Sequence, residues 1–287
     1  MTKTIIITGT SSGIGKALAL HLAQSGHKVI AVGRTKAALD ELSRTDPSHI
    51  TTLVADITKS EDRLKIKEVL PLGARGIYLV HNAGIAVPTL LADLSEEEWD
   101  QHFSVNTKAP VFLTQLLLPH LQNGGRVLNI STSLAHGALP GFSVYGVSKS
   151  ALYLMKEYLN TELLDQTIVC GSAMPGVVDT PIQEHIRSTS ITKFPAVGLF
   201  LGFKQRDELL APATAAKFLA WLLMETDKEQ FMKGDWDIYD TSHHQHWSTS
   251  RNVSWISGVK FLPLLPMATS LLQMPKPFHP WQTLTAD

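Results

Sequence analysis

The stretch Thr4-Ile5-Ile6-Ile7-Thr8-Gly9-Thr10-Ser11-Ser12-Gly13-Ile14-Gly15 decides the fold. A β-branched strand runs directly into a glycine-rich turn, and a segment of helical period, 15–25, follows the turn. Glycines at a strand-to-helix turn let a pyrophosphate approach the backbone, and the free N–H groups at the helix start attract its charge. The stretch therefore predicts the first strand, turn and helix of a dinucleotide-binding domain.

Short β-branched runs alternate with longer segments of helical period along the rest of the chain, which is typical of a parallel sheet with helices on both faces. We expect strands at 4–8, 28–32, 50–54, 76–80, 126–130, 167–173 and 235–239. We expect helices at 15–25, 36–43, 60–70, 96–121 with a break near Pro110, 145–163 and 212–224. Ser95 and Glu98 form a capping box before one of them. The predicted fold class is α/β, a single Rossmann-type doubly wound parallel sheet of about seven strands.

Composition and charge narrow the class of protein. The 287 residues are 44% hydrophobic and 18% charged, which predicts a buried core of ordinary size. Lys and Arg number 25 against 26 Asp and Glu, so the formal net charge is -1. No block of like charge offers an electrostatic footprint for nucleic acid. We therefore expect a small-molecule substrate and no nucleic-acid partner.

The sequence has the features of a soluble cytoplasmic protein. Its single cysteine, Cys170, lies in an apolar run, where we expect a buried small hydrophobe that forms neither a disulfide nor a thiolate metal site. Residues 1–8 lack the charged start and long apolar stretch of a secretory signal. The apolar stretch 253–274 is interrupted by Lys260, Pro263 and Pro266, which disfavours a membrane-spanning helix.

The end of the second expected strand indicates which cofactor is bound. An acidic residue at this position would bind both hydroxyls of an adenine ribose. Here the position holds Gly33, followed by Arg34. Gly33 adds no negative charge to repel a 2′-phosphate, and the Arg34 guanidinium matches phosphate geometry with its fork of donors. The pair favours NADP(H) over NAD(H), with an ordinary surface cation as the alternative role for Arg34.

Several further motifs follow the glycine turn in a recognisable order. They are Asp56 with Ile57, His81-Asn82-Ala83-Gly84, Asn106 in the long helix, Tyr145-Gly146-Val147-Ser148-Lys149, and Pro175-Gly176-Val177-Val178-Asp179-Thr180. Through these motifs residues 1–240 resemble the short-chain dehydrogenase/reductase superfamily. His81 departs from the commoner Asn at its position, whereas the key Asn of the family is retained as Asn82.

The resemblance implies a set of cofactor contacts. The residues concerned are Gly9, Ser11, Ser12, Gly13, Ile14, Gly15, Arg34, Asp56, Ile57, Asn82, Ala83, Gly84, Tyr145, Lys149, Pro175, Gly176, Val178 and Thr180. In the family Asp56 contacts the adenine end, and Lys149 bonds the nicotinamide ribose. Val178 and Thr180 serve the carboxamide and phosphates, and Asn106 holds a water that links Lys149 to solvent.

The catalytic residue types fit the chemistry of carbonyl reduction. Hydride transfer to a carbonyl carbon leaves an alkoxide that must gain a proton from a positioned acid. Tyr145 is the expected acid, and Lys149 lies one turn along the same helix face, where its ammonium lowers the pKa of the phenol. Thr132 is the expected substrate-orienting hydroxyl, with Ser133 and Ser131 as open alternatives. We predict an NADP(H)-dependent oxidoreductase, a carbonyl reductase; a catalytically silent NADP(H)-binding regulator is the alternative.

Two stretches, 175–190 and 234–240, look most like the sepiapterin reductase and benzil reductase group, which implies reduction of a dicarbonyl or similar ketone. The apolar run 194–203 lies in an expected substrate lid at about 183–210 and predicts a lipophilic substrate.

The C-terminal part and the assembly complete the prediction. We expect a catalytic domain at 1–241 and an extension, 242–287, that packs on the body or on a neighbouring subunit; peripheral membrane attachment is the rival. We interpret His243-His244-Gln245-His246 as a solvated loop, with an inter-subunit contact as the alternative and no bound metal. Helices 96–121 and 145–163 pair between subunits in relatives, so we expect a homodimer or homotetramer.

Overall fold

The computed structural model describes residues 2–163 and 167–248. Within these ranges the chain forms one parallel sheet in the order β3-β2-β1-β4-β5-β6-β7. The strands are β1 (Thr4–Thr8), β2 (Lys28–Gly33), β3 (Ile50–Val54), β4 (Tyr78–His81), β5 (Arg126–Ile130), β6 (Val169–Met174) and β7 (Trp236–Asp237). The predicted doubly wound Rossmann-type sheet is confirmed.

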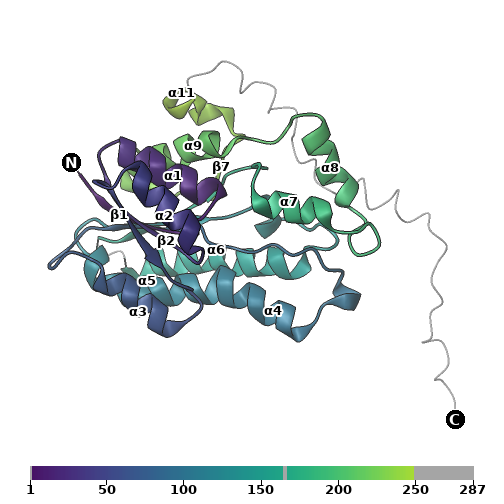
Figure 1. The fold of residues 1–287 in the computed structure, drawn as a ribbon, viewed down its shortest axis with the longest axis horizontal. Coiled ribbons are helices and arrows are strands. Elements are labelled where there is room, and N and C mark those ends of the chain that lie inside the picture. The colour runs from purple at the N-terminus through teal and green to yellow at the C-terminus, as the bar shows by residue number, and fades with distance from the viewer. Residues whose placement is uncertain (1, 164–166, 249–287) are drawn as a thin grey trace, which may run out of the picture.

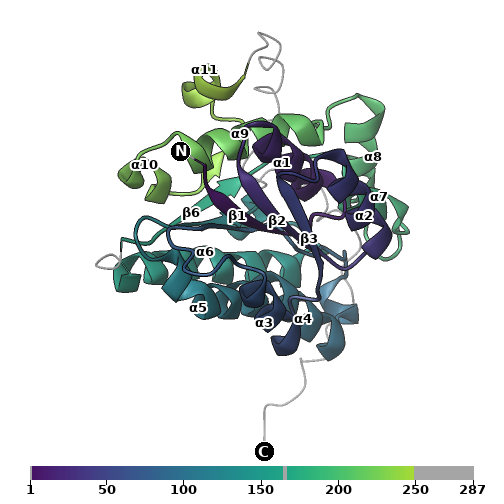
Figure 2. The same cartoon turned by 60° about the vertical axis from the view of Figure 1, so that its left-hand side comes forward.

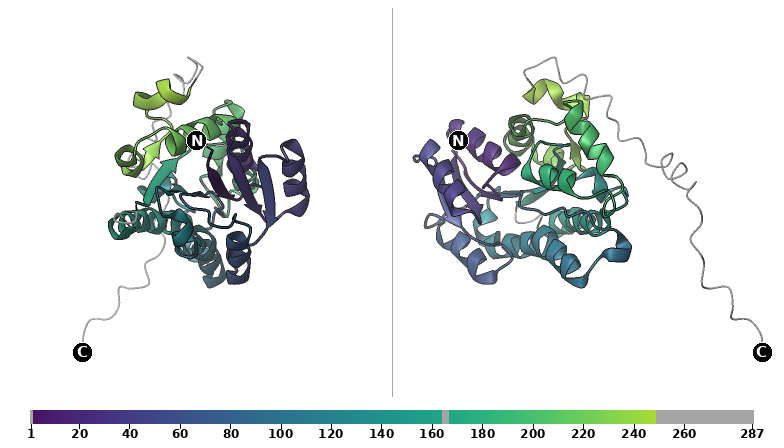
Figure 3. Two further views of the ribbon diagram at one scale, coloured as in Figure 1. Left: turned by 90° about the vertical axis from the view of Figure 1, so that its left-hand side faces the viewer. Right: turned by 45° about the vertical axis from the view of Figure 1, so that its right-hand side comes forward.

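Helices cover both faces of the sheet, as Figures 1 and 2 show. On one face lie α1 (Gly13–Gln24), α2 (Lys36–Thr45) and α9 (Pro212–Met224). On the other lie α3 (Ser60–Glu68), α4 (Glu96–Phe103), α5 (Ala109–Leu121) and α6 (Ser143–Leu163). Figure 3 shows the same three layers from two further sides.

The apolar residues of the strands explain why helices pack on both faces of the sheet. Side chains of a strand alternate between the faces of a sheet, so a strand that is covered on both sides is apolar throughout. In β1, Ile5 and Ile7 belong to the core cluster beneath α1 and α9, while Ile6 belongs to the cluster beneath α3 and α5. All three isoleucines are fully buried, which is why this stretch carries so much of the fold.

The long helix expected at 96–121 is divided. α4 begins at the predicted capping box, in which Ser95 and Glu98 each bond the other's backbone N–H. A π-helical segment, Ser104–Lys108, then separates α4 from α5, and Pro110 lies in the first turn of α5. Pro110 has no N–H to donate to the preceding turn, so the break falls where the sequence predicted it. The π-helical segment carries Asn106.

Some short helices were not predicted. They are α7 (Pro181–Ser188), α8 (Val197–Gln205), α10 (Lys228–Met232) and α11 (His244–Trp247), together with short turns of 3-10 helix. α7 and α8 occupy the segment expected as a lid, and Figure 1 shows them together at one end of the molecule. Backbone hydrogen bonds join Val177, Asp179 and Leu210, so both ends of the lid are tied to the end of β6.

The interpretation of 243–246 as a solvated loop is wrong for its first two histidines. His243 is buried, and its ring stacks against the rings of Phe218 and Trp221, which also contact each other. Its Nδ1 accepts from Trp247 Nε1 at 2.9 Å, while His244 Nε2 lies 2.7 Å from the Ile238 carbonyl oxygen. The imidazoles of His243 and His244 are therefore held by aromatic packing and hydrogen bonds.

Most of the C-terminal extension, residues 249–287, lies outside the described residues. Its described start contributes Trp247 to the core cluster beneath α9. Within 2–163 and 167–248, no helix combines the length and apolar character needed to cross a membrane.

Candidate functional site

A cleft of about 1050 Å³ opens at the carboxyl ends of the strands. It spans the point between β1 and β4 where the strand order reverses, the usual ligand position in an open α/β sheet. Every predicted cofactor contact except Gly15 lies on its wall. The walls also include Thr132, Phe142, Gln183, Phe200 and Tyr239.

The glycine turn forms one end of the cleft. Gly9 and Gly13 have φ of 73° and 55°, in the left-handed region that favours glycine. A Cβ on Gly9 would lie 2.8 Å from Ala83 Cα, so the turn needs glycine for space as well. Ser12 precedes α1 without capping it through its side chain, which leaves the first N–H groups of the helix available to an anion.

Two residues support the turn from behind. Asn82 Nδ2 donates to the carbonyl oxygens of Thr8 and Gly9, at 2.8 and 3.0 Å. A Cβ on Gly15 would lie 2.3 Å from the Gly9 carbonyl oxygen, so Gly15 packs the helix against the turn. Sequence reasoning placed Gly15 among the contacts, whereas the structure gives it this packing position.

The end of β2 borders the far side of the turn. A Cβ on Gly33 would lie 2.5 Å from Ser11 Oγ, so this position excludes an aspartate unless Ser11 moves. Arg34 is exposed and lines the cleft. It forms no ion pair with any described residue. A guanidinium so placed is free to meet an anionic group at the mouth of the cleft.

The predicted catalytic residues converge at the centre of the cleft. Tyr145 and Lys149 come from α6, and Thr132 follows β5. Lys149 Nζ donates to the Ile130 carbonyl oxygen at 2.8 Å. A Cβ on Gly84 would lie 3.5 Å from Lys149 Nζ and 3.2 Å from Asn106 Oδ1, so the lysine and the asparagine share one neighbour.

Asn106 lies behind the wall of the cleft rather than on it. Its side chain exchanges hydrogen bonds with the backbone N–H and carbonyl of Ile85, both at 2.9 Å, and donates to Ser148 Oγ at 3.1 Å. The π-helical segment turns the side chain inward, away from the regular helix face. Asn106 therefore holds the segment after β4 against α6.

Burial dominates the protonation of the site. It raises the pKa of Tyr145 to about 12, and a hydrogen bond with Thr132 acts in the opposite direction. It lowers the pKa of Lys149 to about 8, while the charge of Asp235 raises it. The expected lowering of the Tyr145 pKa by Lys149 is not found in this structure: burial and Thr132 are the influences on that pKa, and the Lys149 ammonium donates to the Ile130 carbonyl oxygen instead. Tyr145 is therefore a protonated phenol at neutral pH.

The three neighbouring hydroxyls have different surroundings. Thr132 is the one of the three that acts on Tyr145, because it lowers the pKa of the phenol, and its Oγ1 accepts from Leu134 N at 3.3 Å. Ser131 points elsewhere, because its Oγ donates to Asp235 Oδ2 at 2.6 Å. Ser133 also lines the cleft. The geometry favours Thr132 as the hydroxyl beside the phenol.

The loop after β6 closes the cleft over the centre. Gly176 has φ of 80°, and a Cβ there would lie 2.7 Å from the Tyr239 hydroxyl. That hydroxyl accepts from Val177 N at 3.0 Å, which fixes the loop. A Cβ on Gly13 would lie 3.0 Å from Thr180 Cγ2, so this loop meets the glycine turn.

The lid end of the cleft is apolar and aromatic. The Phe142 ring lies 5.9 Å from the Tyr145 ring and 5.7 Å from that of Phe200. Leu134, Leu139 and Ile186 line the same cleft. Gln183 is an amide among these side chains, and its Oε1 is buried with no hydrogen-bond partner in the described part of the chain. This end suits an apolar ligand that carries a hydrogen-bonding group.

Sequence reasoning missed Asp235 and His136, which lie behind the catalytic centre. His136 Nε2 is 2.9 Å from Asp235 Oδ2, the same oxygen that accepts from Ser131. Residues 99 positions apart along the chain meet here, and no local spacing signals such a pairing.

Comparison with known proteins agrees with the fold. The family model described as short chain dehydrogenase matches residues 3–191. The chain is 33% identical over 204 residues to the 3-oxoacyl-(acyl-carrier-protein) reductase of Thermotoga maritima, covering 67% of this chain and 82% of that protein. It is 33% identical over 231 residues to the benzil reductase of Bacillus subtilis, covering 76% and 92%.

A solved structure is also similar. The 3-ketoacyl-(acyl-carrier-protein) reductase from Brucella melitensis, complexed with NADH, gives a TM-score of 0.70 at 26% identity. The match covers 82% of this chain and 96% of that one. The resemblance read from the motifs is confirmed, with a benzil reductase among the relatives. The chain belongs to the short chain dehydrogenase family of oxidoreductases.

Proposed function

We propose that the protein is an NADP(H)-dependent oxidoreductase that interconverts a lipophilic ketone or dicarbonyl and the corresponding alcohol. One observation carries the proposal: Tyr145, Lys149 and Thr132 meet in a cleft whose far end is a glycine turn at a helix start. The relatives named above are reductases by name, which supports the reaction class.

The cleft fits a dinucleotide with a 2′-phosphate. The left-handed glycines and the uncapped start of α1 provide a cradle for the pyrophosphate. Ser11, Gly33 and Arg34 surround the position of the adenine ribose, where they offer hydroxyl and guanidinium donors and no carboxylate. The bound cofactor would supply or accept the hydride.

The chain's own residues manage the proton. In the reductive direction Tyr145, protonated at neutral pH, donates its proton to the oxygen of the substrate as negative charge develops there. Thr132, which lines the same cleft and acts on the pKa of the same phenol, orients that oxygen. Lys149 holds its ammonium on the Ile130 carbonyl oxygen in the same cleft, and its positive charge would offset the negative charge that develops there during the transfer.

The lid end supports the proposed substrate class. Aromatic side chains of Phe142 and Phe200 favour a flat apolar group next to Tyr145. Gln183 offers an amide to a second polar group of that substrate. An aromatic 1,2-diketone satisfies both conditions.

We further propose a homodimer or homotetramer in the cytoplasm. Exposed apolar side chains on α5 and α6, namely Phe112, Leu154 and Tyr158, support an interface on the face opposite to α9. A monomer by light scattering at micromolar concentration would contradict it. We do not favour a regulator without turnover, because Tyr145, Lys149 and Thr132 line one cleft.

Consumption of NADPH with benzil, followed by absorbance, tests the proposed function. Tyr145→Phe keeps the ring and removes the proton, so kcat should fall by at least about a hundredfold, the usual contribution of a general acid. NADPH affinity, measured by fluorescence, should stay within about twofold of wild type, because the hydroxyl contributes little to ground-state binding. Tyr158→Phe, an exposed tyrosine on the same helix, serves as the matched control. Near-normal turnover by Tyr145→Phe would refute the mechanism.

A further inference from the structure

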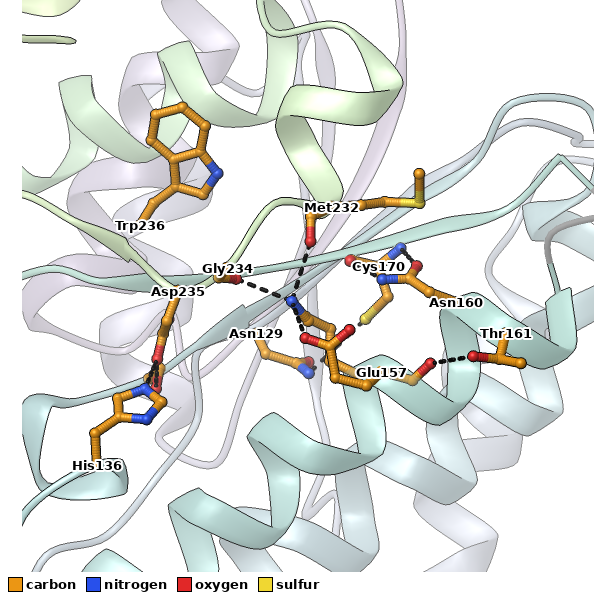
Figure 4. Close-up of polar contacts among 12 residues, drawn as sticks. Asn129, His136, Glu157, Asn160, Thr161, Cys170, Met232, Gly234, Asp235 and Trp236 are labelled. Atoms are coloured by element: carbon orange, nitrogen blue, oxygen red, sulfur yellow. Dashed lines mark hydrogen bonds and ion pairs between the residues drawn. The ribbon is translucent and has the colours of Figure 1, made fainter. Parts of the chain in front are cut away.

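A buried carboxylate lies beside the catalytic end of β5. The Asp235 side chain, just before β7, is 4% exposed. Its Oδ2 receives the Ser131 hydroxyl and the His136 ring, and Figure 4 shows that ring directly against the carboxylate. Its Oδ1 is buried without a hydrogen-bond partner among the described residues. A negative charge so placed is weakly screened and acts strongly on neighbouring groups.

Helix α6 holds this carboxylate in position. Lys156 is fully buried, and its Nζ donates to the carbonyl oxygens of Met232 and Gly234, at 3.1 and 2.9 Å. Figure 4 shows Gly234 and Asp235 adjacent to each other, in the segment just before β7. The Tyr153 ring packs edge-on against His136, with the centroids 4.6 Å apart. Lys149, Tyr153 and Lys156 are successive turns of one helix face, so α6 fixes Asp235 relative to Lys149.

Lys149 and Asp235 both form hydrogen bonds with residues at the carboxyl end of β5. Lys149 bonds the carbonyl of Ile130, and Asp235 bonds the hydroxyl of the next residue, Ser131. Burial lowers the pKa of Lys149 to about 8, and the negative charge of Asp235 is the influence that raises it. The carboxylate thus opposes the loss of the lysine's proton.

Other titratable groups face the pair. His81 stays neutral, because burial and then the charge of Lys149 lower its pKa to about 3. Tyr145 keeps its proton, since burial raises its pKa to about 12. Burial is the main cause that raises the pKa of Tyr153 and of Asp237, and the negative charge of Asp235 raises both further. Lys149 is therefore the group near Asp235 that titrates at mildly alkaline pH.

We propose that Asp235 is a positioning residue for Lys149: a buried carboxylate, held by Ser131, His136 and α6, that stabilises the positive charge of the lysine. The inference rests on the proposed function, in which that charge assists proton transfer from Tyr145. It predicts that a substitution that removes the negative charge of Asp235 and keeps the shape of the side chain lowers the pKa of Lys149.

The test compares two substitutions that remove the same charge. Asp235→Asn is isosteric and can still accept the hydrogen bond of Ser131. Asp46→Asn is the matched control, because Asp46 also bonds a serine hydroxyl and a histidine ring, those of Ser48 and His49, in the loop before β3. Thermal melting verifies that both variants fold.

Two readouts separate charge from structure. With ¹³C-labelled lysine, NMR follows the titration of Lys149, whose signal is assigned by its loss in Lys149→Met. The midpoint should fall in Asp235→Asn and stay unchanged in Asp46→Asn. In benzil reduction, kcat/KM of Asp235→Asn should lose about three- to tenfold more at pH 9 than at pH 6, as expected when an alkaline limb moves by half to one pH unit.

The outcomes distinguish the inference from the proposed function. An unchanged Lys149 midpoint in Asp235→Asn overturns the inference, even if the wild type reduces benzil. A lowered midpoint supports it, even if the wild type shows no turnover, in which case the proposed function fails alone. His136→Gln, which keeps both the carboxylate and a donor, should leave the midpoint in place. A midpoint that falls as far in this variant as in Asp235→Asn overturns the role of the charge.

Discussion

Arg34 offers the sharpest prediction about the cofactor. Arg34→Ala removes an exposed guanidinium that forms no ion pair with a described residue, so the free energy of unfolding should stay within about 0.5 kcal/mol of wild type. A hydrogen bond to a charged group contributes about 1.5–3 kcal/mol. Solvent exposure places Arg34 at the lower end of this range, so NADPH affinity should fall by about tenfold.

Fluorescence titration with NADPH and with NADH measures this effect. NADH lacks the 2′-phosphate, so its affinity should change by less than about twofold. Arg44→Ala, at the exposed end of α2, is the matched control for the general loss of a positive charge. Equal losses for both cofactors, or a loss for NADPH as large in Arg44→Ala, would refute the assignment of Arg34 to the phosphate.

Two further predictions concern stability. His81 has a pKa of about 3 in the folded chain and near 6.5 in the unfolded chain. Between these pH values the unfolded chain binds more protons, so the free energy of unfolding falls as the pH drops through this window. His81→Asn should therefore reduce the fall in melting temperature between pH 6.5 and 4, and an unchanged slope would contradict this expectation. Phe194 belongs to the lid segment and is fully buried against Phe142 and Phe200, so Phe194→Ala should cost about 3–5 kcal/mol and raise KM for benzil. Thermal and denaturant unfolding measure this cost, and a loss no greater than that of Leu201→Ala, a half-exposed side chain of α8, would refute the packing role.

The sequence predicted the fold where local pattern and global burial agree. The bounds of β1, β3, β5 and α9 were predicted residue for residue, because their apolar periods end at glycines, prolines or polar residues that also end the elements. β7 proved shorter than expected, since it pairs only at Ala173 and Met174. The short helices α7 and α8 were missed because tertiary contacts around Phe194 stabilise them more than their own propensity does.

The candidate site was predictable where its residues lie in contiguous motifs. Most of the glycine turn, Asn82, Tyr145 and Lys149 line one cleft. The pair of Asp235 and His136 arises only when β5, α6 and the segment before β7 come together, and neither residue belongs to a recognisable spacing. The protonation of Tyr145 likewise depends on burial, which a helical spacing of tyrosine and lysine does not convey.

Hydride transfer itself can be followed with NADPH that carries deuterium at both positions of nicotinamide C4. We expect the wild type to convert benzil to a hydroxyketone with one deuterium on the carbinol carbon, and Tyr145→Phe to form this product at least about a hundredfold more slowly. Mass spectrometry and NMR of the product give the answer. A product without cofactor-derived deuterium, or no product although NADPH binds, would contradict the central claim that this cleft transfers hydride to a carbonyl.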